Sequence, residues 1–142
     1  MKAPSAALIA AVAALPAMAQ GTRSACTANN AGITVPSGFC VQVVADSLGA
    51  ARHVAVAPNG DLLVAIRNTN TTRGGVVVLR DADGDGVAEV RRSFGIGGGT
   101  GIAFHNDYLY FATDSAIVRW RWPSGTLEPA GAPDTIVSGL PA

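Results

Sequence analysis

Short apolar runs separated by short polar turns fill the chain between residues 99 and 122. The last run, Ile117–Trp122, has a strict period of two, with two tryptophans and a valine on one side and an isoleucine and two arginines on the other. This period predicts a half-buried β-strand whose polar side faces water. Aromatic and β-branched residues, which pleated sheets favour, dominate the segment. We therefore expect three antiparallel strands here, at 102–104, 108–113 and 117–122.

The same pattern occurs earlier in the chain. An apolar run at 53–57, the turn Pro58–Asp61 and a returning run at 62–66 repeat the arrangement around Asn106, and a third run follows at 75–80. A repeat of roughly 40–50 residues built from short antiparallel strands is typical of β-propeller blades. We expect an all-β fold with about two blades, which is an incomplete ring because closure needs about four to eight blades.

The first residues have the features of a secretory signal peptide. Lys2 supplies the positive end, Ala6–Leu15 is apolar, and Ala17–Ala19 has the small-x-small form of a cleavage site. The apolar run is shorter than the about 20 residues that a membrane span needs. We expect a signal peptide at 1–19, a periplasmic or secreted product, and no membrane span after cleavage; an uncleaved anchor is the alternative.

The charge balance excludes some classes of partner. The sequence has ten basic and ten acidic residues and a formal net charge of zero. A chain without excess positive charge has no electrostatic basis for binding nucleic acid or an anionic membrane. We therefore expect neither partner.

Both cysteines of the chain, Cys26 and Cys40, lie near the start of the expected mature protein. In an exported chain such a pair predicts a disulfide, and a metal or redox role lacks the usual CxxC spacing. The bond would staple an irregular segment at 20–38 to a predicted strand, Phe39–Ala45. That strand either completes the last blade of a ring or adds to the edge of the first blade.

The remaining chain, 39–142, is expected to form the partial propeller. Blade one covers about 52–94, and blade two covers about 99–138 with its fourth strand at 134–137. The glycine-rich run 95–99 between them lacks the lysine of a phosphate-binding loop and leads into a strand, so no helix N-terminus awaits a phosphate. We interpret it as a link where two backbone segments pass close to each other.

An Asp/Gly-rich loop follows the third strand of blade one. Asp81, Asp83 and Asp85 alternate with small residues, and Glu89 comes four positions later. Several carboxylates around one point suit calcium. An EF-hand would place its bidentate glutamate at position twelve of the loop, where this chain has Arg92. The loop is either a compact calcium site of another kind or a hairpin turn built from the same residue types.

In their order, these segments resemble one family. PSGFCVQVVADSLGAARHVAVAPNGDLLVA, the Asp/Gly loop, GTGIAFHNDYLYFATDSAIVRWRW and PDTIVSGLP are similar to the opening of the sorbosone dehydrogenase family, which is related to the soluble quinoprotein glucose dehydrogenases. The resemblance implies a six-bladed β-propeller, pyrroloquinoline quinone (PQQ) and calcium as cofactors, and periplasmic oxidation of sugar aldehydes or alcohols. It also implies a catalytic base just beyond Pro141, and therefore no catalytic residue within the chain.

The resemblance also implies which rim of the propeller carries the cofactor. Because strands alternate in direction, the beginning of the first strand and the link between the second and third lie on the same rim. By this likeness Arg52, His53 and Arg67 are candidates for cofactor binding, with the arginines pairing to quinone carboxylates. The alternative for each is a solvated or turn-capping residue. His105 is expected at a turn on the opposite face and is interpreted as structural.

Three hypotheses for the function remain. The first is the N-terminal portion of a PQQ-dependent sugar dehydrogenase, inactive on its own, with a sugar as substrate and the remaining blades as its partner. The second is a non-enzymatic exported propeller module that binds carbohydrate or protein. The third is a truncated product that does not fold. The two histidines are expected on opposite faces, so no Ser-His-Asp set is available.

Overall fold

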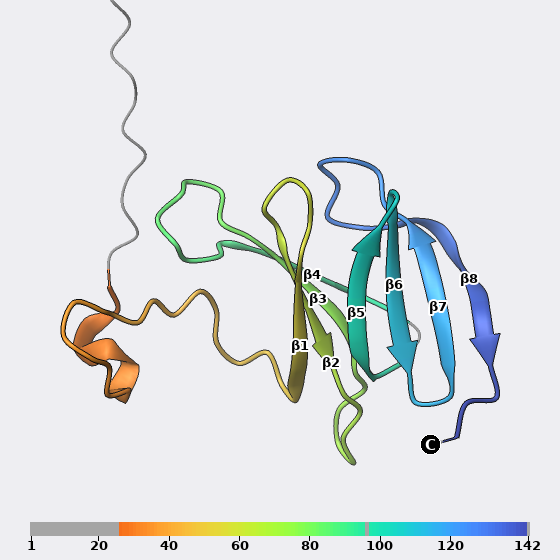
Figure 1. Ribbon diagram of the computed structural model, residues 1–142, viewed down its shortest axis with the longest axis horizontal. Coiled ribbons are helices and arrows are strands. Elements are labelled where there is room, and N and C mark those ends of the chain that lie inside the picture. The colour runs from red at the N-terminus through yellow and green to blue at the C-terminus, as the bar shows by residue number, and fades with distance from the viewer. Residues whose placement is uncertain (1–25, 96, 142) are drawn as a thin grey trace, which may run out of the picture.

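Figure 1 shows a computed structural model of the protein, which describes residues 26–95 and 97–141. The predicted signal peptide lies outside the described residues. The regular structure of the described chain is all-β, as predicted, apart from one short 3-10 helix, η1 (Ala28–Gly32). Its strands are β1 (Ala51–Val56), β2 (Leu62–Ile66), β3 (Gly75–Arg80), β4 (Val90–Phe94), β5 (Gly99–His105), β6 (Tyr108–Thr113), β7 (Ala116–Arg121) and β8 (Ala130–Ser138).

The strands form two separate antiparallel sheets. Sheet 1 contains β1 to β4 and sheet 2 contains β5 to β8, and in both sheets each strand pairs with the next along the chain. This confirms the prediction of two successive four-stranded units. The predicted fourth strand at 134–137 is present within the longer β8. The two sheets do not close into a ring (Figure 1).

The first hairpins of the two sheets differ in their turns. In sheet 2, Asn106 and Asp107 have φ of 46° and 62° and make a two-residue turn. Asparagine and aspartate tolerate this left-handed conformation better than other non-glycine residues. In sheet 1 the turn between β1 and β2 is longer, and Gly60 supplies its positive φ of 93°. The turn of sheet 1 is therefore longer than the corresponding turn of sheet 2.

A continuous apolar core lies between the sheets. Val118, Trp120 and Trp122 are buried as the period of two predicted, and Arg121 is exposed. Phe94 of β4 reaches across to sheet 2, where its ring meets that of Trp120 edge-on at 5.4 Å between centroids. The buried core residues are Ala57, Leu63, Ala65, Val76, Val78, Leu109, Phe111, Val118, Trp120 and Trp122. The two sheets therefore share one core.

The other face of sheet 1 is also apolar but is covered only in part. Val64, Ile66, Val77 and Leu79 are buried there, with Ala45 and Leu48 packed against them. On β1, Val54 and Val56 are 55% and 60% exposed. Their register partners Val64 and Leu62 belong to this face. The face therefore extends beyond the part that the N-terminal segment covers.

The predicted strand Phe39–Ala45 is wrong. The segment is not part of any sheet among the described residues, and Phe39 is 72% exposed. Its backbone groups are bound instead by the preceding loop: Thr27 N–H donates to Val41 O at 2.8 Å, and Val43 N–H donates to Thr27 Oγ1 at 2.8 Å. Local side-chain oxygens that bind backbone groups compete with a strand ladder. The run of apolar residues suggested a strand but did not specify a partner strand.

The structure contains the disulfide between Cys26 and Cys40, which encloses η1. The chain that follows Cys40 is attached to the β3–β4 loop of sheet 1 by a hydrogen bond from Ala88 N–H to Val44 O at 2.8 Å. No helix in the described part of the chain is long and apolar enough to cross a membrane.

The sheets are arranged as a wedge with two rims. Between the sheets, β5 lies close to β1 and β2 (Figure 1). The upper rim in Figure 1 carries the β1–β2 turn, the β3–β4 loop, the β5–β6 turn and the β7–β8 loop. The lower rim carries the links β2–β3, β4–β5 and β6–β7. This division follows from the alternating strand directions, and every candidate residue lies on one of these rims.

Candidate functional site

The three residues predicted to bind a cofactor lie at or near the lower rim. Arg52 and His53 are near the start of β1, and Arg67 follows β2 directly. Arg67 N–H donates to Ala50 O at 3.0 Å, so the beginning of β1 and the end of β2 are adjacent. All three side chains are exposed, and none makes a hydrogen bond or ion pair within the described chain. The fold brings them to one region but does not make them converge.

Asn68 connects the links of the lower rim, a role that the sequence did not reveal. Its Oδ1 accepts hydrogen bonds from Gly74 N–H and Gly98 N–H, both at 2.9 Å. A Cβ on Gly98 would lie 2.1 Å from the backbone nitrogen of Asn68. The glycine-rich run is therefore a place of close backbone approach, as predicted. Asn68 thereby joins sheet 1 to the start of sheet 2.

The predicted lower-rim residues, Arg52, His53 and Arg67, have the charge that an anionic quinone requires, but they do not enclose a binding pocket. Two arginines suit carboxylate groups because guanidinium pairs with carboxylate through two hydrogen bonds. A hollow of about 200 Å³ lies on this rim, and its lining includes Thr72, Arg73 and Phe94. Arg52, His53 and Arg67 are not among the residues that line it. These two sheets therefore offer charge for the quinone without a pocket built from the predicted residues.

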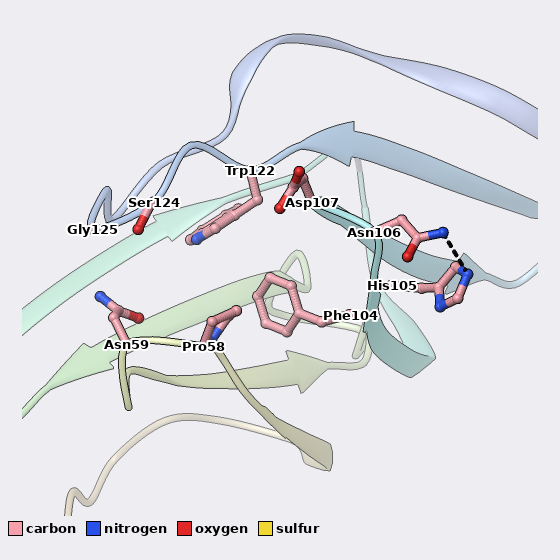
Figure 2. Close-up of a pocket in the computed structure, with 9 residues that line it drawn as sticks. All are labelled: Pro58, Asn59, Phe104, His105, Asn106, Asp107, Trp122, Ser124 and Gly125. Atoms are coloured by element: carbon pink, nitrogen blue, oxygen red, sulfur yellow. Dashed lines mark hydrogen bonds between the residues drawn. The ribbon is translucent and has the colours of Figure 1, made fainter.

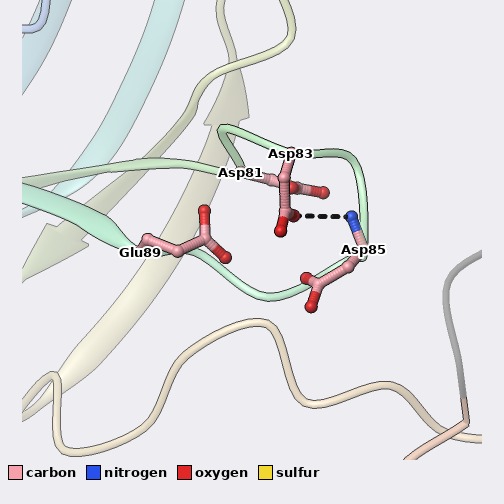
Figure 3. A group of neighbouring side chains, drawn as sticks. All are labelled: Asp81, Asp83, Asp85 and Glu89. Carbon is pink, nitrogen blue, oxygen red and sulfur yellow. Dashed lines mark hydrogen bonds between the residues drawn. The ribbon is translucent and has the colours of Figure 1, made fainter. Parts of the chain in front are cut away.

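The four predicted calcium ligands come together in the β3–β4 loop (Figure 3). One carboxylate oxygen from each of Asp81, Asp83, Asp85 and Glu89 lies within 4.8 Å of the others, and all four residues are exposed. Oxygen atoms in this arrangement match the donor type that calcium prefers. The loop lies on the upper rim, opposite the predicted quinone residues (Figure 1).

The same carboxylates also hold the loop together as a turn. Asp81 accepts from Gly86 N–H at 2.8 Å and from Gly84 N–H at 2.6 Å, and these backbone bonds hold the pKa of Asp81 below its ordinary value. Glu89 Oε2 accepts from Ala82 N–H at 2.8 Å and closes the loop. Both interpretations of the loop, as a calcium site and as a hairpin turn, agree with this geometry.

At the upper rim an ion pair between buried Asp61 and half-buried Arg80 lies within sheet 1, and Arg80 also reaches the β7–β8 loop of sheet 2. Asp61 is 4% exposed and receives two hydrogen bonds from Arg80, from Nε at 2.8 Å and from Nη2 at 2.7 Å. The same Nη2 donates to Gly125 O in the β7–β8 loop at 2.9 Å. The bonds from Arg80 hold the pKa of Asp61 below its ordinary value, in spite of the opposing effect of burial. The sequence marked Asp61 only as a turn residue.

A cleft of about 440 Å³ lies beside this ion pair, between the two sheets (Figure 2). It is bounded by the β1–β2 turn, the end of β5 with its turn, and the start of the β7–β8 loop. The sequence did not indicate it, because its walls come from three separate segments. Its lining residues are Pro58, Asn59, Phe104, His105, Asn106, Asp107, Trp122, Ser124 and Gly125.

His105 lies on this upper rim, where its Nε2 is 3.0 Å from Asn106 Nδ2. His53 is on β1 near the lower rim, so the two histidines are separated as predicted. His105 lines the cleft together with Asp107 and Ser124, but within the described residues its ring is hydrogen-bonded only to Asn106, so these three side chains do not form a hydrogen-bonded Ser-His-Asp set.

Comparison with known proteins gives no relative for this chain. No family model matches it, no curated protein matches it, and no solved structure matches it.

Proposed function

We propose that the two sheets are neighbouring blades of a β-propeller of the quinone-dependent sugar dehydrogenase type. In this proposal the chain is an exported, periplasmic protein that works with further blades. PQQ, when bound, supplies the two-electron oxidation of a sugar aldehyde or alcohol. Arg52 and Arg67 contribute positive charge toward the carboxylates of PQQ, with His53 beside them. The β3–β4 loop holds a structural calcium ion through its four carboxylates.

The observation that carries the proposal is the wedge of two consecutive antiparallel sheets. Radial repetition of four-stranded sheets, with the first strands nearest the axis, is the plan of a propeller. Consistent with this plan, β5 lies close to β1 and β2. The outer face of sheet 1 is apolar, and Val54 and Val56 are more than half exposed on it. Repeat units bury such faces against a neighbouring unit.

The dehydrogenase chemistry rests on the quoted sequence segments and on charge. On the lower rim, Arg52 and Arg67 have no competing ion pair among the described residues. The disulfide between Cys26 and Cys40 agrees with export, because disulfides persist in oxidising compartments. Because this rim is exposed, we expect a quinone to bind to it weakly. The direct test is therefore a measurement of quinone binding and not of enzymatic turnover.

The test is a titration of the full chain with PQQ, followed by quenching of tryptophan fluorescence, with calcium and with a chelator. We expect binding that is weakened in Arg52→Ala and in Arg67→Ala. Arg121→Ala is the matched control, because Arg121 is also exposed but lies at the end of β7. Equal binding by all four proteins, or no binding at all, contradicts the proposal.

The second candidate function is a non-enzymatic propeller module that binds carbohydrate or protein. It is favoured by the absence of Arg52, His53 and Arg67 from the lining of the lower-rim hollow. The same titration separates the two candidates. A chain that binds sugar but no quinone is a module of this kind.

A further inference from the structure

The cleft on the upper rim lies away from every residue assigned to the quinone. The arginine candidates are at or near the lower rim, whereas Pro58, Phe104 and Trp122 meet at the upper rim (Figure 2). The cleft is also distinct from the β3–β4 loop, because none of the four acidic residues of that loop lines it. A ligand bound here is therefore independent of the quinone-dependent function proposed above, and a sugar bound here would locate the binding site of the carbohydrate-binding module named as the second candidate.

One wall of the cleft is apolar and rigid. The rings of Phe104 and Trp122 meet at 5.7 Å between centroids with an angle of 77° between their planes, so they form a corner. Phe104 is half-buried and Trp122 is only 5% exposed, and both belong to or pack against the core between the sheets. Pro58 faces this corner across the cleft in Figure 2. The wall offers C–H and ring surface that packing already holds in place.

Polar groups of both kinds surround this apolar corner. The Asp107 carboxylate accepts hydrogen bonds, and the Ser124 hydroxyl donates and accepts. Neither side chain makes a hydrogen bond within the described part of the chain, so both are available to a ligand. Asn59 and Asn106 add amide groups at opposite ends of the lining (Figure 2).

A buried donor without a partner lies in the same wall. Trp122 Nε1 is buried and makes no hydrogen bond to any described residue. Figure 2 shows this nitrogen at the end of the cleft lined by Asn59, Ser124 and Gly125. Buried polar atoms in native proteins are almost always hydrogen-bonded, so an unpaired donor indicates a missing acceptor. An oxygen atom bound at this end of the cleft would be that acceptor.

The charges of the lining exclude several classes of ligand. Asp107 is the only acidic residue in it, and it contains no arginine or lysine. An anion such as phosphate or a carboxylate would meet one negative charge and no positive partner. A simple cation would use the carboxylate and the aromatic rings but would leave the amide and hydroxyl donors unused.

We propose that this cleft binds one ring of a neutral carbohydrate. A sugar ring presents apolar C–H faces together with hydroxyl groups that both donate and accept, which matches the corner of Phe104 and Trp122 with the groups of Asp107 and Ser124. The cleft volume of about 440 Å³ lies within the range of small-molecule sites. The site orients a sugar by stacking and hydrogen bonding and performs no chemistry on it.

The experiment is saturation-transfer NMR on the full chain, with chelator present and without quinone. The probes are glucose, galactose, mannose and cellobiose, with tetramethylammonium chloride as a cationic probe. We expect transfer to the ring protons of at least one sugar. The affinity should fall about tenfold in Asp107→Asn, which loses one charge-assisted hydrogen bond. Asparagine tolerates the left-handed backbone of residue 107, where φ is 62°, so the turn is kept.

Two further variants separate the site from the fold. Ser124→Ala changes an exposed side chain in the β7–β8 loop and should also weaken sugar binding, with an unchanged melting temperature. Asp114→Asn, an aspartate in the β6–β7 link on the lower rim, is the matched control and should bind like the original chain. The proposal is overturned if no sugar binds, or if Asp107→Asn and Ser124→Ala both bind sugar as tightly as the original chain does. Binding of tetramethylammonium alone, lost in Asp107→Asn, also overturns it and makes the cleft a cation site. Failure of PQQ to bind, tested separately, leaves this result unaffected.

Discussion

Replacing Gly98 by alanine tests how the two sheets are joined at the lower rim. The added methyl group would lie 2.1 Å from the backbone nitrogen of Asn68 and 2.8 Å from the carbonyl carbon of Arg67. Both of these neighbours are backbone atoms, so the methyl group cannot be accommodated by the movement of a flexible side chain. The β4–β5 link must therefore separate from the β2–β3 link by about 1 Å to restore ordinary contact.

The energetic cost of Gly98→Ala follows from two contributions. Overpacking in a tightly packed region costs about 1–3 kcal/mol. The separation also breaks the hydrogen bond of 2.9 Å from Gly98 N–H to Asn68 Oδ1. A hydrogen bond of this kind contributes about 0.5–1.5 kcal/mol. We therefore expect the free energy of unfolding to fall by about 2–4 kcal/mol.

Urea unfolding, followed by circular dichroism and tryptophan fluorescence, measures this change. With a slope of about 1–3 kcal/mol per molar urea, the midpoint should fall by about 1–2 M. Gly101→Ala is the control, because its methyl group would meet only the Cβ of Ala112, at 3.0 Å. The close approach at Asn68 would be refuted if Gly98→Ala unfolded at the same urea concentration as the original chain. It would also be refuted if Gly101→Ala lowered the midpoint as much as Gly98→Ala does.

Three further predictions concern the ion pair, the acidic loop and the disulfide. Because Arg80 lowers the pKa of Asp61, the stabilisation by this pair is present above the ordinary pKa of 3.8 and is lost as the pH falls through the lower folded value. Asp61→Asn should therefore unfold with a weaker acid dependence than the original chain, and an identical pH profile argues against the pair. Calcium binding measured by calorimetry should disappear in Asp83→Ala and persist in Asp114→Ala; binding retained in Asp83→Ala would leave the hairpin-turn interpretation of the loop. Reducing the Cys26–Cys40 disulfide, with a sequence separation of 14, should lower stability by up to about 3 kcal/mol, and two thiols that alkylate without reductant in exported protein would contradict the bond.

The sequence alone determined the first three strands of each sheet, the fourth strand of sheet 2 and the positions of most turns. The period of two at Ile117–Trp122 and the apolar runs around Pro58–Asp61 depend on neighbours only a few residues away, so they can be recognised in the chain itself. The close spacing of Asp81, Asp83, Asp85 and Glu89 predicted that their carboxylates meet, because one short loop contains all four. Local patterns of this kind need no knowledge of how the sheets pack.

Only the tertiary structure decided which distant residues meet. Arg80 reaches Gly125 across 45 positions, and Asn68 binds Gly98 across 30 positions, and each contact exists only because sheet 1 packs on sheet 2. The cleft with Trp122 depends on the same packing. Phe39–Ala45 shows the converse: its apolar residues suit a strand, but a strand also needs a neighbour with free backbone groups. The choice of partner depends on the whole fold, and for this reason the pattern of a single segment could not predict it.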